Sequence, residues 1–87
     1  MAEQRPYRPV FSDFAAEFIV SLPKRKQRRV LHSADQLAAD PFLRSDYTLE
    51  DDDGRSIEHL LVNGLVFTYW VDHAECLVMI TEIDDAE

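Results

Sequence analysis

The feature that most constrains the fold is a change in the spacing of apolar residues near residue 46. Before this point, Phe14, Phe18 and Leu22 recur every four residues, and a second stretch that reaches about Ala39 keeps helical spacing. After it, apolar and polar residues alternate, which is typical of strands. Because a chain of 87 residues is too short to divide into two cores, the sequence predicts one domain, residues 1–87, in which helices pack on a sheet.

Residues that start and stop helices set the predicted boundaries. Ser12 is a typical N-cap for a helix from Asp13 to about Leu22, and Pro23 separates it from a second helix that Pro41 stops. A short strand over residues 7–11 precedes them and is confined to an edge or a strand start by its proline. From the helical spacing we expect a core that contains one face of residues 65–72 and four side chains of the helices, namely Phe14, Phe18, Leu31 and Leu37.

Two turn dipeptides organise the second half of the chain. Asp53-Gly54 and Asn63-Gly64 accept the positive φ angles of tight hairpins. They separate strands that we expect near residues 46–50, 56–62, 65–72 and 76–83. The predicted fold class is therefore α+β, with a helical hairpin packed on one face of an antiparallel sheet and the element order β-α-α-β-β-β-β.

Charge is distributed unevenly along the chain. Residues 1–44 have a net charge of +3 and residues 45–87 a net charge of −11, which gives −8 in total. Affinity for bare nucleic acid depends on Lys and Arg that neutralise phosphates, so we expect weak binding of this kind or none. The single cysteine, Cys76, favours a reducing cytoplasm, and no apolar run is long enough to predict a membrane span.

A basic cluster opens the second predicted helix. Five of its six residues are cationic, and such a run is either an ordinary solvated helix face or a surface that docks an acidic partner. That partner could be another protein or a second copy of the chain, and we take the docking surface as the hypothesis to test. Its residues are Lys24, Arg25, Lys26, Arg28 and Arg29.

His59 and Arg55 are the candidate catalytic residues. Cleavage of RNA through its 2′-hydroxyl needs a base, an acid and a cation for the phosphorane charge, and these two could supply two of the three roles. An ordinary polar strand face is the alternative interpretation. Neighbouring Glu58 would lie on the opposite face of the strand.

The sequence predicts no metal site and no cofactor. The acidic run before Gly54 has leucines where a calcium loop needs its first and last carboxylates. His73 and Cys76 have the spacing of half a zinc site, but no second pair accompanies them.

Six short motifs, in order and spacing, resemble the RelE/ParE toxin superfamily along nearly the whole chain. They include LPK between the helices and LAADP at the end of the second helix, and they lie at residues 11–14, 22–24, 37–41, 47–49, 54–55 and 68–72. The resemblance implies a type II toxin of a bacterium or archaeon, of the kind found in plasmid stabilization systems. It also implies a cytoplasmic protein that is bound by a cognate antitoxin and acts on gyrase or on the translation machinery.

Most of the cations of RelE-type ribonucleases are missing at the matching positions. The strand residues 57–61 offer only His59 where the family has lysines, and Val66 stands where an arginine is expected after Gly64. The last residues, 84–87, contain three acids and no Arg, His or Tyr. Whether the chain is an enzyme therefore stays open. The alternatives to a protein-directed toxin are a non-catalytic interaction domain and an atypical ribosome-dependent mRNA endonuclease.

Overall fold

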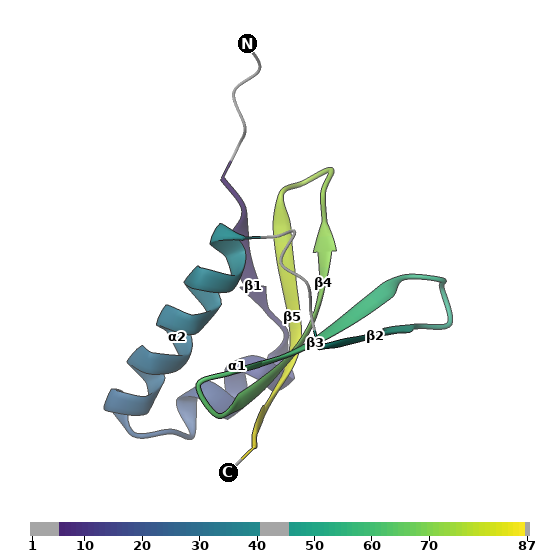
Figure 1. Ribbon diagram of the computed structural model, residues 1–87. Coiled ribbons are helices and arrows are strands. Elements are labelled where there is room, and N and C mark those ends of the chain that lie inside the picture. The colour runs from purple at the N-terminus through teal and green to yellow at the C-terminus, as the bar shows by residue number, and fades with distance from the viewer. Residues whose placement is uncertain (1–5, 41–45, 87) are drawn as a thin grey trace.

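The computed structural model of the chain describes residues 6–40 and 46–86 and places two helices against a five-stranded sheet (Figure 1). The predicted element order is confirmed, and most boundaries agree within two residues. The predicted helix stop at Pro41 lies outside the described residues. The elements are β1 (Arg8–Phe11), α1 (Asp13–Val20), α2 (Lys24–Ala39), β2 (Tyr47–Glu50), β3 (Ser56–Val62), β4 (Leu65–Asp72) and β5 (Leu77–Asp85).

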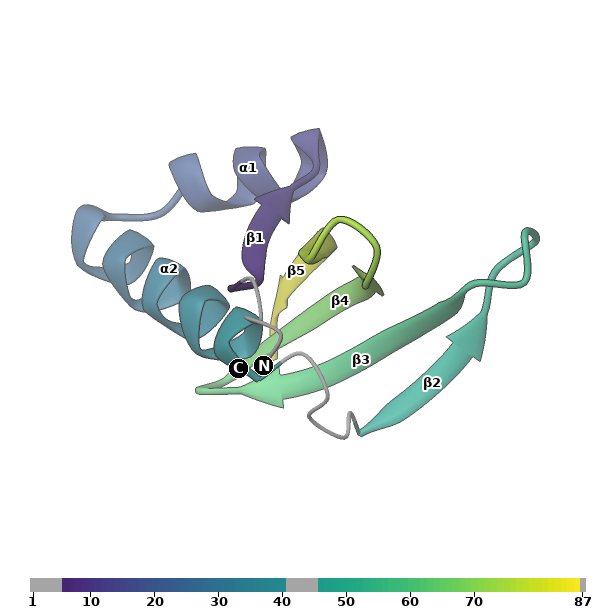
Figure 2. The same ribbon diagram turned by 90° about the horizontal axis from the view of Figure 1, so that it is seen from above.

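The strand order of the sheet is β1-β5-β4-β3-β2. The pairs β5–β4, β4–β3 and β3–β2 are antiparallel, whereas β1 pairs parallel with β5. The sheet is thus mixed, which corrects the expectation of a wholly antiparallel one. Both helices cover the same face, and the β2–β3 hairpin extends beyond the part of the sheet that they cover (Figure 2). Within the described ranges, no helix is both long and apolar enough to cross a bilayer.

The core lies between the helices and the strands β3, β4 and β5. Leu37 is buried as expected, and Phe18 packs against the core from its edge. The expectation was wrong for Phe14, which is 78% exposed, and for Leu31, which is 43% exposed. In their place the helices bury mostly smaller side chains, which let them approach the sheet closely: Ala15, Ile19, Val30, Ser33, Ala34 and Ala38.

Ser12 connects the start of α1 to the middle of β5. As predicted, it is the N-cap, and its side-chain oxygen accepts a hydrogen bond from the Ala15 amide at 3.1 Å. The same hydroxyl donates to the Thr81 carbonyl at 2.6 Å, and the Ser12 amide donates to the Ile80 carbonyl at 2.9 Å. The register of β4 and β5 shifts here, so that Thr81 is the extra residue of a bulge and both Ile80 and Ile83 face the helices.

Replacement of Ser12 by alanine should lower the free energy of unfolding by about 1 to 2 kcal/mol, because the helix cap and the bond to Thr81 are lost together. Ser21→Ala is the matched control, since the Ser21 hydroxyl bonds only locally, to the Phe18 carbonyl, at an exposed site. It should cost less than about 0.5 kcal/mol. Chemical denaturation of both variants measures the difference, and equal losses would contradict the role given to Ser12.

Candidate functional site

The face of the sheet that the helices leave uncovered carries the candidate catalytic residues. Phe67 and Tyr69 are buried against the helices, so the alternate residues of β4 point to the other face. The register then places His59 of β3 on this outer face between Tyr47 of β2 and Thr68 of β4. Glu58 lies on the helix-covered face, as the strand alternation predicts.

His59 is held against its neighbour on the edge strand. Its ring stacks on that of Tyr47, with 4.3 Å between ring centroids and 8° between the ring planes. The Nδ1 atom of His59 is buried and has no hydrogen-bond partner among the described residues. A neutral imidazole donates from one nitrogen and accepts at the other. The Nε2 nitrogen is therefore the one that is left to exchange a proton with a ligand on this face.

Arg55 precedes β3 and is already engaged by groups of its own hairpin. Its Nε lies 3.3 Å from a carboxylate oxygen of Asp51, and its Nη2 lies 3.0 Å from one of Asp53. The guanidinium carbon also lies 4.6 Å from the centroid of the Trp70 ring on the outer face. The side chain thus ties the hairpin tip to the sheet, and the two carboxylates offset its charge, which weakens its attraction for a phosphate.

The remaining charges of the outer face are mainly acidic. Asp72, Glu82 and Asp84 share this face by register, and Arg8 of β1 is the further cation on it. Such a surface opposes the approach of RNA phosphates. The arrangement offers one imidazole, one guanidinium paired with two carboxylates, and a second guanidinium, Arg8, on the distant edge strand β1. This is a poor set for phosphoryl chemistry but not an obstacle to contact with a protein.

The basic cluster lies on the other side of the molecule from His59 and Arg55. Its five residues, Lys24, Arg25, Lys26, Arg28 and Arg29, all belong to the first turns of α2 and are all exposed. None of them forms an ion pair with any described residue. The structure therefore separates the two predicted sites, one on each side of the sheet.

The half zinc site suggested by the spacing of His73 and Cys76 has no further ligands nearby. Over residues 6–40 and 46–86, no group of three or more His, Cys, Asp or Glu side chains lies close enough to hold a metal ion. His73 instead shares a hydrogen bond of 2.7 Å between its Nδ1 and the Tyr7 hydroxyl.

Two residues of the outer face were missed by sequence reasoning. Tyr47 packs on His59, and Trp70 lies under Arg55. Turn chemistry alone would not have found Tyr47, because a two-residue turn at Asp53-Gly54 would place it opposite Leu60, whereas the observed pairing is centred on Asp53 and places it opposite His59.

Comparison with known proteins supports the fold and nothing finer. No protein-family model matches the sequence, and no curated protein matches it. Among solved structures, the toxin-antitoxin complex RelBE2 from Mycobacterium tuberculosis has a chain that matches with a TM-score of 0.75 and 21% identity, over 93% of this chain and 99% of that one. The chain has the fold of the RelE toxins. The archaeal RelE-RelB complex from Pyrococcus horikoshii OT3 also matches, with a TM-score of 0.71, 21% identity, and coverage of 94% of this chain and 97% of that one.

The two matches support the predicted α+β architecture, and each covers more than nine tenths of this chain. At 21% identity, the likeness concerns the fold alone. The chemistry of the surface has to be argued from this chain's own residues.

Proposed function

We propose that the chain is the toxin-like component of a type II toxin-antitoxin pair, that an antitoxin binds it, and that it acts on a protein target rather than by cutting RNA. The antitoxin partner is supported by the two matching structures, which are described as a toxin-antitoxin complex and as a RelE-RelB complex. The proposal implies a prokaryotic cytoplasm. Gyrase and the translation machinery are the target classes to be tested.

The observation that carries the choice of a protein target is the state of Arg55. The guanidinium pairs with Asp51 and Asp53 and packs on Trp70, so two carboxylates already offset the charge that a developing phosphorane would need. The remaining carboxylates of the outer face oppose RNA as well. A protein surface has no comparable requirement for cations.

The atypical ribonuclease is kept as a second candidate because of His59. The His59 ring is fixed by the stack on Tyr47 and lies on the same face as Arg55. An acid-base group is therefore present on the face where RNA cleavage would take place. On its own, an imidazole can transfer a proton but cannot hold the phosphate.

The test has two steps: the DNA on either side of the gene is searched for a small adjacent reading frame, and the chain is then induced in a bacterial host with and without the product of such a frame. We expect growth to stop on induction, to recover when the neighbouring product is present, and to proceed without new mRNA 5′ ends. The variants His59→Gln and Arg55→Gln should inhibit growth to within about twofold of the wild type, because neither residue contributes to a protein-directed activity.

The other outcomes each support a different reading. New mRNA ends that disappear in His59→Gln would establish the ribonuclease instead. Binding of the neighbouring product without any effect on growth would indicate a non-catalytic interaction domain. Failure to bind that product would remove the toxin-antitoxin assignment.

A further inference from the structure

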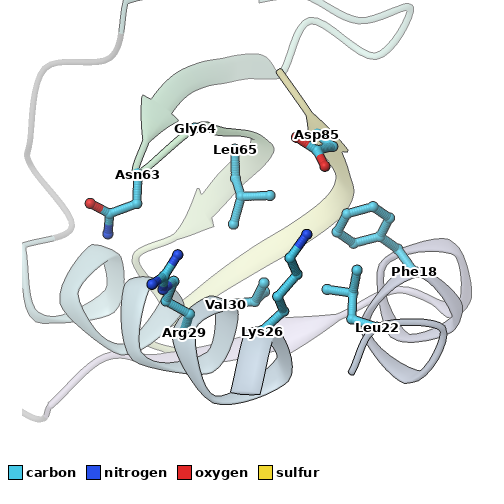
Figure 3. Close-up of a pocket in the computed structure, with 9 residues that line it drawn as sticks. All are labelled: Phe18, Leu22, Lys26, Arg29, Val30, Asn63, Gly64, Leu65 and Asp85. Atoms are coloured by element: carbon cyan, nitrogen blue, oxygen red, sulfur yellow. The ribbon is translucent and has the colours of Figure 1, made fainter. Parts of the chain in front are cut away.

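A small pocket lies between the helical hairpin and the end of the sheet (Figure 3). It is on the helix-covered side, whereas the register places His59 on the outer face. Phe18, Leu22, Val30 and Leu65 form its apolar lining. Lys26 and Arg29 lie along its α2 edge, while Asp85 lies on the opposite rim. The Asn63-Gly64 turn closes one end, where the Ala86 amide donates to the Gly64 carbonyl at 2.8 Å.

The size of the pocket limits what can enter it. Its volume is about 50 Å³, whereas a cavity that holds benzene has about 150 Å³ and a site for a cofactor or drug-sized ligand about 300 to 1,000 Å³. The pocket is therefore suited to the end of one aliphatic side chain and is too small for a whole metabolite. An occupant of this kind must be held mainly by contacts outside the pocket.

Those outside contacts are available on α2, where helical geometry divides the basic cluster into two groups. Lys26 and Arg29 lie beside Val30, on the side of the helix that borders the pocket. Arg25 lies one turn before Arg29 on the same side. Lys24 and Arg28 lie on the opposite side of the helix. Only part of the cluster can thus act together with the apolar lining.

The start of α2 strengthens the positive potential at this edge. Its N-cap is Pro23, which offers no side-chain acceptor, and the first turn contains no acidic residue. The partial positive charge of the helix N-terminus therefore adds to that of the cations instead of being neutralised within the chain. The carboxylates of a partner would be attracted both by the cations and by the helix N-terminus.

We propose that this pocket receives one aliphatic side chain of an acidic partner segment, with the segment's carboxylates paired to Lys26 and Arg29. The proposal rests on the proposed function only in assigning that segment to the antitoxin. Asp85 on the far rim favours an orientation in which the partner's acids lie over α2. An acidic peptide fits better than RNA, because phosphates gain nothing from the apolar lining.

The experiment measures binding of a short peptide by amide chemical shifts of the full chain. The peptide is blocked at both ends and has one central leucine between glutamates. We expect shifts at Arg29, Asn63, Gly64 and Leu65. Replacement of the peptide's leucine by serine should weaken binding at least about fivefold, since the buried part of the contact is then lost.

Two double variants with equal changes in charge separate docking from general attraction. Lys26→Glu with Arg29→Glu should weaken binding at least about tenfold, whereas Lys24→Glu with Arg28→Glu should change it less than about threefold. Both variants place carboxylates in the first turns of α2, which the helix dipole favours, so both are expected to fold.

Equal losses in the two variants would show a solvated cationic face and overturn the proposal. So would a wild-type chain that gives no shifts with peptide at millimolar concentration, or one that binds a single-stranded RNA oligonucleotide at the same amides more tightly than the peptide. If the neighbouring gene's product binds the chain while these peptide results are negative, the proposed function stands and the pocket is excluded.

Discussion

Replacement of Phe67 by alanine is expected to lower the free energy of unfolding by about 3 to 5 kcal/mol, the range for truncation of a buried phenylalanine. The Phe67 side chain is 0% exposed and lies on β4 between Leu60 of β3 and Ile83 of β5. A domain of this length has a total stability of about 5 to 10 kcal/mol, so the variant should keep only part of it. Urea unfolding, followed by fluorescence of the single tryptophan, Trp70, measures the loss.

Phe14→Ala is the matched control, because the same atoms are removed from a side chain that is 78% exposed. It should change the free energy of unfolding by less than about 0.5 kcal/mol. A loss at Phe14 that equals the loss at Phe67 would mean that α1 packs on the sheet through a different face.

Most strand boundaries could be predicted from the sequence because local turn chemistry determines them. Gly54 and Gly64 both adopt a φ of 79°, and Asn63 adopts a φ of 53°, all in the left-handed region that these residue types tolerate. Once such a turn is fixed, the alternation of side chains decides which residues face the helices. At the Asp53-Gly54 turn, however, the observed pairing is centred on Asp53, so Tyr47 lies opposite His59 and not opposite Leu60, as a two-residue turn would place it.

The buried faces of the helices were harder to predict because spacing alone does not fix their rotation. Phe14 and Phe18 share a helical stripe, but the buried face of α1 is centred between Phe18 and Ile19, which leaves Phe14 at its margin. Ala15, the residue after Phe14, is the one that is buried. Sequence patterns favour large apolar residues as the predicted buried ones, whereas a helix that lies close to a sheet needs small side chains at the contact.

The features that were missed join segments far apart in the chain. The parallel pairing of β1 with β5 connects Arg8 to Leu77 and has no local sequence signal. The pocket combines Lys26 with Asn63 and Asp85 in the same way. Charge counting along the sequence described the basic cluster as one unit, and only the folded chain shows which of its cations adjoin an apolar surface.

The two faces of the sheet have separate consequences for function. The RelE-like fold supplies a scaffold, but the chemistry of a site depends on the side chains placed on it. On the outer face, Arg55 is paired with two carboxylates at a hairpin tip, and the other cation, Arg8, lies on the edge strand β1, far across the sheet from His59. Near the helical hairpin, the cations are exposed and border a pocket. The charge distribution therefore favours recognition of an acidic protein over cleavage of RNA.

Stability should fall at alkaline pH through Tyr69, which lies in the core and is 2% exposed. Burial raises the pKa of Tyr69 to about 12, with Glu58, Asp40 and Asp46 adding to the effect. The unfolded phenol ionises near its usual pKa of 10.0. The contribution of this shift is thus fully present below about pH 10 and is lost as the pH rises towards about 12.

The expected loss from Tyr69 is about 2 kcal/mol between about pH 9 and about pH 11.5, because each pKa unit is worth about 1.4 kcal/mol. Tyr69→Phe keeps the ring and removes the ionising group, so its free energy of unfolding should fall by about 2 kcal/mol less over the same interval. Titration of every other tyrosine and lysine occurs in both proteins and cancels from the difference. Urea unfolding at the two pH values gives the four free energies needed. Parallel losses in the wild type and the variant would mean that the Tyr69 hydroxyl reaches water in the folded chain, and the placement of Tyr69 in the core would then be wrong.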